Sequence, residues 1–256
     1  MAGLASLNIS DNRMRMDGLA GPVGIRTLAA LLRLASESLE KAKAATRGER
    51  FAAVTRLRGT GRGIHFSNLV AALEAEHPLT LVSPFEDSDL VAGGVWDGNV
   101  LIGGNCKAAL AKLRWSAGAD DLPMHVHDFS DRFIIVHEGR GFFHVSDQGF
   151  DEFDGSDVRS IPAHERDVFI FTRGVVHTFS TLDQPMTLLS CQLRYVAFDD
   201  PDQFRIPAHR WIARDNPERA VPCVACDPAW TVLAHGKNRS VRETTIHPLA
   251  GVPPLA

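Results

Sequence analysis

A run of short β-prone segments between residues 85 and 198 constrains the fold of this chain more than any other feature of its sequence. Many short strands with turn signals between them indicate a β-sandwich or a closed barrel. The stretch is long enough for the roughly eight or more strands of a jelly roll. The segments, separated by Gly, Asp and Pro, are LVAGGVW, NVLIGG, AALAKLRW, DRFIIVHE, GFFHVSD, VRSIPA, DVFIF, HTFST and MTLLSCQLRYVAF.

The part of the chain before this run has helical character. Apolar residues recur at helical spacing from Ile25 to Ala45, in a segment rich in Ala, Leu, Lys and Glu, which predicts a helix there. A second helix is expected over Glu49–Leu57. A third is expected over residues 68–76, and it must end before Pro78.

Three regions follow from these patterns. We expect an N-terminal helical segment over residues 1–80, a barrel over residues 81–198 and an irregular, Pro-rich C-terminal arm over residues 199–256. The arm is expected to pack on the barrel or on a partner subunit, and the chain is expected to form a homodimer. No internal repeat is evident, which argues against a second barrel.

Charge is distributed unevenly along the chain. The stretch from Arg26 to Arg62 holds nine Lys or Arg and three Glu residues, a net charge of +6, whereas the rest of the chain is at −10. This stretch lacks a helix-turn-helix pattern, so a solvated or barrel-packing helix pair is favoured over a DNA-binding element. The N-terminus lacks the features of a signal peptide and no apolar run is long enough to span a membrane, which favours a cytoplasmic protein without membrane contact.

Histidines gather in two separated segments. In GADDLPMHVHDFSDRFIIVHEGRGFF, residues 118–143, His125 and His127 stand two apart, so on a strand both imidazoles point to the same face. Such a pair is half of a mononuclear metal site, but it also occurs by chance in a chain with 11 histidines. In ERDVFIFTRGVVHTFST, residues 165–181, an apolar strand ends in a Gly-containing turn and His177 opens the next strand.

The two segments resemble, in order, the two sequence motifs of the cupin superfamily. The first motif reads G, about five residues, HxH, three or four residues, E, six residues, G, and this chain matches it at Gly118, His125, His127 and Gly139. The second segment matches less fully, because it lacks the first Gly and the Pro. The resemblance implies a mainly β cupin barrel, a double-stranded β-helix or jelly roll, in which His125, His127 and His177 are metal ligands. It also implies a hairpin at residues 138–141.

The fourth ligand of the family is missing from its usual place. Six residues before Gly139 stands Arg132 where the family has Glu, and Asp131 is one residue earlier. Adjacent strand residues point to opposite sides, so only one of the two can face the metal. Three arrangements stay open: a site of three histidines, a mixed site in which a bulge lets Asp131 act as ligand, or a metal-free site in which Arg132 binds an anion.

Other residues are candidates for substrate contacts. Trp115 and Arg114 lead into the first motif, and one of them faces inward. On the last predicted strand Gln192 and Arg194 belong to a polar set that contacts a substrate if that set faces the interior. Cys223 and Cys226 have the spacing of half a zinc site, although two cysteines in an irregular arm are more often simply buried.

Two functions follow from the resemblance. The first is a metal-dependent enzyme acting on a small anionic organic molecule, with dioxygenase chemistry favoured and isomerase, lyase or hydrolase chemistry as alternatives. Its cofactor would be one divalent metal ion, with Fe(II) favoured over Mn(II), Ni(II) or Zn(II) because three histidines form a neutral shell. The second is a non-catalytic, ligand-sensing protein whose basic N-terminal segment contacts DNA or a protein partner.

Overall fold

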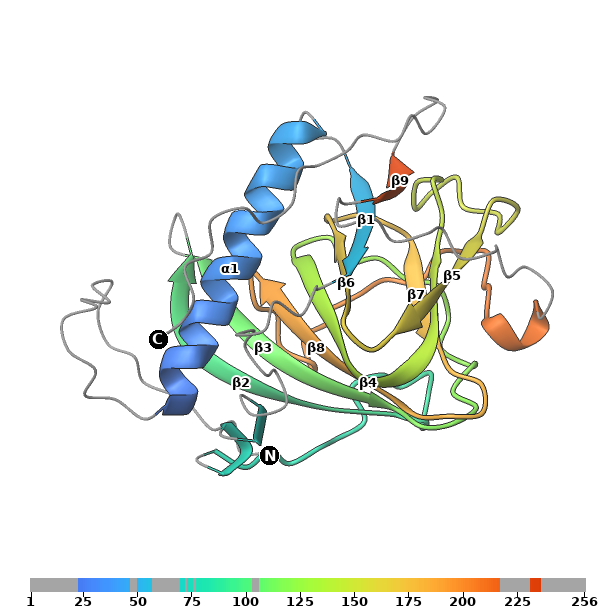
Figure 1. Ribbon diagram of the computed structural model, residues 1–256. Coiled ribbons are helices and arrows are strands. Elements are labelled where there is room, and N and C mark those ends of the chain that lie inside the picture. Colours follow the sequence, from blue (N-terminus) through green and yellow to red (C-terminus); the bar gives the residue numbers. More distant parts are fainter. Residues whose placement is uncertain are drawn as a thin grey trace.

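In the computed structural model one helix packs against a barrel of antiparallel strands (Figure 1). The structure describes residues 23–46, 50–56, 70–71, 73–75, 77–102, 106–216 and 231–235. No helix in these ranges combines the length and apolarity that a membrane crossing requires. The elements are α1 Val23–Ala45, β1 Phe51–Arg56, β2 Val91–Ile102, β3 Cys106–Trp115, β4 Asp131–Val145, β5 Arg159–His164, β6 Asp167–Phe171, β7 His177–Ser180, β8 Met186–Leu193, the 3-10 helix η1 Ala213–Asp215 and β9 Thr231–His235.

Strand β4 organises the barrel because its two halves pair with different neighbours. Seven strands are hydrogen-bonded in the order β2-β3-β8-β4-β6-β1-β9, and the remaining two, β5 and β7, also pair with β4. The first half of β4 pairs with β6 and β8, whereas residues 140–145 pair with β5 and β7. A register shift between Val136 and Glu138, followed by Gly139 at φ 77°, marks the place where β4 passes from one set of partners to the other.

The expected hairpin at residues 138–141 is therefore wrong. These residues continue β4, and the hairpin comes later, between β4 and β5, where residues 146–158 form the connection. The glycines that suggested a turn instead allow a bulged, bent strand. At Gly139 a side-chain carbon would lie 2.0 Å from the carbonyl oxygen of Pro185, so glycine is required by close approach of the backbones.

The expected second helix is also wrong. Residues 51–56 form β1, which pairs with β6 on one side and β9 on the other. Its side chains alternate between two apolar clusters, with Ala52 and Val54 in the barrel interior and Phe51 and Ala53 on the outer face. Tertiary pairing and burial on both faces outweigh local helix propensity here. The third predicted helix lies partly outside the described residues, and residues 70–71 and 73–75 are helical.

Helix α1 covers the outer face of β2, β3 and β8 (Figure 1). Its apolar stripe and the outward-facing side chains of the strands form one cluster, which we call the outer cluster. A second, inner cluster fills the barrel. The outer cluster consists of Leu28, Leu31, Leu32, Ala35, Leu39, Ala42, Phe51, Ala53, Val70, Leu73, Trp96, Ala108, Leu110, Phe133, Ile135, Val168, Ile170, Leu189 and Cys191.

Candidate metal centre

The three predicted histidines meet inside the barrel. His125 and His177 form an isolated antiparallel bridge, in which each backbone N–H donates to the carbonyl of the other residue at 2.9 and 3.0 Å. His127 follows two residues after His125, so its side chain returns to the same face. The side chains are buried, and their candidate ligand nitrogens all lie within 4.8 Å of one another. A metal bound by three imidazoles holds its ligand nitrogens about 3 to 4 Å apart, so small side-chain rotations suffice.

Backbone carbonyls fix the tautomer of each histidine. The Nδ1 atoms of His125 and His177 lie 2.9 and 2.8 Å from the carbonyl oxygens of Pro123 and Val175. The Nδ1 atom of His127 lies 2.5 Å from the carbonyl oxygen of Gln203. Because a carbonyl only accepts, each Nδ1 carries the proton and each Nε2 keeps its lone pair for an ion. The donor set therefore fits a divalent metal ion.

Burial keeps these histidines neutral, the form that binds metals. Desolvation lowers the pKa of His125 to about 4. The pKa values of His127 and His177 are lowered well below the usual value, by burial first. The next cause is the charge of Arg132 for His127, and for His177 the cost of protonating it next to a protonated His125. All three imidazoles are thus uncharged near neutral pH.

The register of β4 decides which of Asp131 and Arg132 faces the histidines. Arg132 is 2% exposed and points inward, where its Nη1 donates to Ser130 Oγ and its Nη2 lies 3.2 Å from His127 Nδ1. The carbonyl of Gln203 is closer to that nitrogen and requires its proton, so the contact between Arg132 and His127 is not a hydrogen bond. Burial lowers the pKa of Arg132 to about 9, which leaves its guanidinium charged at neutral pH.

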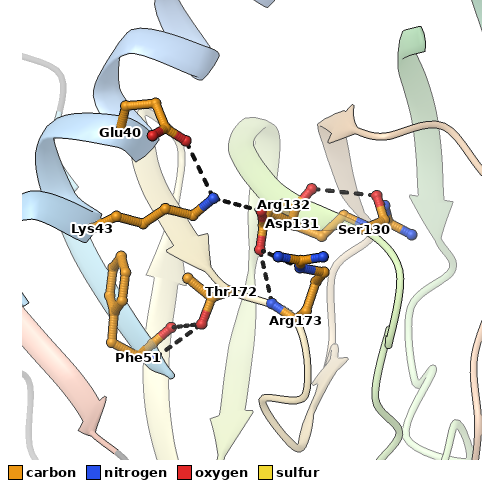
Figure 2. A network of polar contacts seen from close by, with 8 residues as sticks. All are labelled: Glu40, Lys43, Phe51, Ser130, Asp131, Arg132, Thr172 and Arg173. Carbon is orange, nitrogen blue, oxygen red and sulfur yellow. Dashed lines mark hydrogen bonds and ion pairs between the residues drawn. The ribbon is translucent and has the colours of Figure 1, made fainter. Parts of the chain in front are cut away.

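Asp131 points to the opposite side of β4, away from the cluster. Its carboxylate accepts from Lys43 Nζ on α1 and from the Arg173 backbone N–H, both at 2.9 Å (Figure 2). The bulge that would have turned Asp131 inward lies further along the strand, after Val136. The mixed site with an Asp131 ligand is therefore not what the structure shows.

The histidines and Arg132 line a small cavity of about 30 Å³. Trp115 and Gln192 line it too, because both belong to the inward-facing sets of their strands, whereas Arg114 is exposed. Three buried polar atoms around this cavity have no partner among the described residues: Trp115 Nε1, Gln192 Oε1 and Gln203 Oε1. The cavity thus offers hydrogen-bonding groups that a ligand can satisfy.

Arg194 does not join this cavity. Strand β8 ends at Leu193, and Arg194 adopts φ 95°, which breaks the alternation that would have continued inward after Gln192. Its guanidinium carbon lies 5.4 Å from the centre of the Phe129 ring instead. The substrate contact predicted for Arg194 is therefore not supported, because the strand it was assigned to stops one residue too early.

The arm contributes residues to the site that sequence reasoning missed. Gln203 supplies the carbonyl for His127, and Phe204 packs against His125 with ring centroids 5.5 Å apart. The arm is held there by the pairing of Arg205 with Val126. The sequence DDPDQFR has no periodicity that would place it in a barrel. The predicted zinc half-site of Cys223 and Cys226 lies outside the described residues.

A second, larger cavity of about 400 Å³ opens on the outer surface of the strands. It is lined by Lys112, Arg114 and Glu138, among others, and contains none of the predicted metal ligands. Arg114 is the one candidate for a substrate contact among its lining residues. Size alone would favour this cavity, but the chemistry favours the smaller one. Only there do metal-binding nitrogens, a buried cation and unpartnered polar atoms converge.

The antiparallel barrel and its three inward histidines define a cupin-type jelly roll whose histidine cluster fits a metal site. No protein-family model matches the chain, and no curated protein matches it. Several solved structures are similar to part of it. An oxalate oxidase in complex with glycolate is 13% identical, with a TM-score of 0.35 over 45% of this chain and 56% of that one.

Two further structures show the same range of similarity. The polyketide cyclase RemF from Streptomyces resistomycificus is 18% identical, with a TM-score of 0.34 over 48% of this chain and 84% of its own. An oxalate decarboxylase from Bacillus subtilis is 18% identical, with a TM-score of 0.34 over 43% of this chain and 28% of its own. This chain thus spans about half the length of the oxalate oxidase and less of the decarboxylase. At such low scores the cupin-type assignment rests on the strands and histidines of this chain.

Proposed function

We propose that this protein is a metal-dependent cupin enzyme that acts on a small anionic organic molecule, with dioxygenase chemistry. One observation carries the proposal: three buried histidines with fixed tautomers share a cavity with the guanidinium of Arg132. Fe(II) is the preferred ion, because a neutral shell of imidazoles suits it, with Mn(II), Ni(II) and Zn(II) as alternatives. When bound, such an ion supplies Lewis acidity, open coordination positions and, for Fe(II), the redox chemistry of a dioxygenase.

The protein's own residues bind and orient the substrate. The guanidinium of Arg132 presents N–H groups that can donate two parallel hydrogen bonds to the two oxygens of one carboxylate. Trp115 Nε1 adds a donor, and Gln192 Oε1 adds an acceptor for a hydroxyl group. Phenylalanines line the remaining wall and exclude water, which strengthens each of these polar contacts. The substrate proposed is therefore small, negatively charged and able to donate a hydrogen bond.

Metal analysis of the purified protein tests this proposal. We expect close to one divalent ion per chain in the wild type and a loss of most of it in His125→Ala. His164→Ala is the matched control, because that imidazole lies on β5 outside the cavity and its removal should leave metal content unchanged. Dioxygen uptake with small hydroxy and dicarboxylic acids then tests the reaction class. A wild type that binds no divalent ion would overturn the proposal.

The non-catalytic alternative makes a different prediction. A sensor that contacts DNA through its basic N-terminal segment would show salt-dependent retention on heparin, weakened when exposed basic residues of that segment, Arg33 and Lys41, are replaced by glutamine. In the structure Lys43 of this segment is paired with Asp131, and Arg56 with Asp167, so part of its positive charge is used within the chain.

A further inference from the structure

A loop at the start of the arm, residues 196–204, closes one side of the histidine cavity. Phe198 and Gln203 of this loop line the cavity, and Phe204 packs on His125 with ring centroids 5.5 Å apart. The enclosed space of about 30 Å³ has room for about two water molecules. An organic substrate of the class proposed above therefore requires this wall of the cavity to move.

The loop is anchored to the barrel at its two ends. Just before it, the backbone N–H of Tyr195 donates to the carbonyl of Lys107 at 2.7 Å. Just after it, Arg205 and Val126 exchange two backbone hydrogen bonds of 2.9 and 3.0 Å. A compact surface loop whose ends are fixed can move as a unit between its anchors, without unfolding the strands that hold them.

Between the anchors the loop bonds mainly to itself. The backbone N–H of Asp200 donates to the carbonyl of Ala197, and that of Gln203 donates to the carbonyl of Asp200. Within the described part of the chain, one hydrogen bond joins residues 196–204 to the barrel: His127 Nδ1 donates to the carbonyl of Gln203 at 2.5 Å. The contact that holds the loop is thus also the contact that fixes a candidate metal ligand.

Only one of the three histidines depends on the loop in this way. His125 and His177 donate to the carbonyls of Pro123 and Val175, each two residues earlier in the same barrel segment. These two acceptors stay in place wherever the loop lies. Movement of the loop therefore removes the acceptor of His127 and leaves the other two histidines as they are.

The Nδ1 atom of His127 has a second neighbour, which favours the opposite tautomer. Nη2 of Arg132 lies 3.2 Å away, and a guanidinium only donates. While the carbonyl of Gln203 is in place, Nδ1 carries the proton and faces the N–H of Arg132. Once that carbonyl leaves, Arg132 is the neighbour that remains, and Nδ1 can accept from it only without its own proton. The neutral ring then carries its proton on Nε2, the atom that would bind the ion.

We infer that residues 196–204 form a lid over the metal centre, whose closure holds His127 in its metal-binding tautomer and whose opening withdraws that tautomer. The inference rests on the proposed function for the presence of a metal, and adds a device that regulates its site. Because the closed lid raises metal affinity, a bound ion favours closure by the same factor. Closure is incompletely bonded, since Gln203 Oε1 is buried without a partner among the described residues.

Tautomers measured in the metal-free, full-length protein test the inference directly. Long-range nitrogen–proton NMR spectra distinguish imidazoles protonated on Nδ1 from those protonated on Nε2. The double variant Phe198→Ala/Phe204→Ala removes the apolar contacts that hold the lid on the barrel. In it His127 should change from the Nδ1–H to the Nε2–H form, whereas His125 and His177 should keep the Nδ1–H form.

Metal affinity gives a second measurement on the same variant. Equilibrium dialysis against Zn(II) should show a Kd at least about tenfold higher than in the wild type, because loss of the outer partner of a ligating histidine weakens binding by about 10 to 100-fold. Asp199→Asn is the matched control, since this exposed residue lies in the same loop and should leave both the tautomers and the Kd unchanged. Circular dichroism confirms that each variant is folded.

The wild type tests the reverse coupling without any substitution. Chymotrypsin cleavage after Phe198 or Phe204, identified by mass spectrometry, measures lid opening. Saturation with Zn(II) should slow this cleavage by at least about threefold, and cleavage after Leu182, in the exposed turn between β7 and β8, should keep its rate. This experiment decides the inference even if the double variant does not fold.

The outcomes separate this inference from the proposed function. A folded double variant in which His127 keeps the Nδ1–H form overturns the lid as a tautomer switch and leaves a metal enzyme intact. The same holds for an unchanged Kd in that variant, or for cleavage at the lid that Zn(II) does not slow. A wild type that binds no divalent ion overturns the proposed function, whereas the tautomer of His127 in the metal-free variant still decides the inference.

Discussion

Asp131 and Arg132 are neighbours in sequence that contact entirely different parts of the molecule. Arg132 belongs to the inward set of β4 with Ile134 and Val136, whereas Asp131 belongs to the outward set. The carboxylate therefore connects the barrel to α1, and the guanidinium gives the histidine cavity its positive charge. One residue of register therefore decides whether a carboxylate or a guanidinium lies beside the three histidines.

Replacement of Asp131 separates its structural role from metal binding. We expect Asp131→Asn to keep the full metal content of the wild type, because this carboxylate does not face the histidines. Its free energy of unfolding should fall by about 1 to 2 kcal/mol, since Lys43 Nζ loses one of its two charged partners in a partly buried contact and keeps Glu40. Chemical denaturation and metal analysis measure the two quantities. Asp183→Asn, in an exposed pair, should cost less than about 1 kcal/mol. Metal loss in Asp131→Asn would restore that residue as a ligand.

Because His144 is buried and neutral, we expect the free energy of unfolding to fall as the pH becomes acidic. Its imidazole is buried between Ser160 Oγ at 2.8 Å and Ser180 Oγ at 2.7 Å, and burial lowers its pKa to about 3. The unfolded chain takes up this proton near pH 6.5, so stability is intact above that pH and is lost as pH falls toward 3. Between pH 7 and 5 this residue should remove about 2 kcal/mol from the free energy of unfolding.

Denaturation of the metal-free protein at several pH values measures this loss. His144→Gln can still bond to a serine but does not titrate, so its stability should fall less between pH 7 and 5 than that of the wild type. All other histidines contribute equally to both proteins. Equal pH dependence in wild type and variant would contradict the assignment.

At the scale of elements, sequence patterns predicted β-strands well where buried and exposed residues alternate. They predicted them poorly where pairing with strands distant in sequence determines the path of the chain. The histidine segments and most strands of the barrel could be predicted from the sequence, because alternating apolar residues and Gly or Pro boundaries are local signals. The path of β4 was not, since its glycines look like a turn and only the partner strands show that the chain continues. For the same reason the sequence could not show which of Asp131 and Arg132 faces the histidines. It also could not place Gln203 in the site, because the role of Gln203 depends on the fold of the arm.

The bend of β4 predicts unequal effects of alanine at two glycines with the same backbone conformation. Gly139 and Gly118 have φ of 77° and 75°, but a Cβ at Gly139 would lie 2.0 Å from a backbone oxygen, whereas at Gly118 the nearest atom is at 4.0 Å. Gly118→Ala should cost about 1 to 2 kcal/mol for the left-handed conformation alone. Gly139→Ala should cost clearly more, because Pro185 must also shift. Urea denaturation compares them, and equal costs would argue against the strand path.

At the scale of the whole molecule, two apolar clusters share the same strands. Along β4, Ile134 and Val136 belong to the inner cluster, and Phe133 and Ile135 belong to the outer one under α1. The outer face of the barrel is thus a hydrophobic surface that the helix must cover. This arrangement bears on function, because a helical segment that detaches to signal or to bind DNA would expose that surface to water.

Loss of one helix side chain should therefore destabilise the barrel as a whole. Leu32 is fully buried in the outer cluster, and Leu32→Ala should lower the free energy of unfolding by about 2 to 5 kcal/mol. Arg33→Ala, the exposed neighbour, should change it by less than about 0.5 kcal/mol. Because helix and barrel share one core, far-UV dichroism and tryptophan fluorescence should shift together to a lower denaturant midpoint. A barrel transition that keeps its midpoint in Leu32→Ala would show that α1 is an independent module, as the sensor alternative requires.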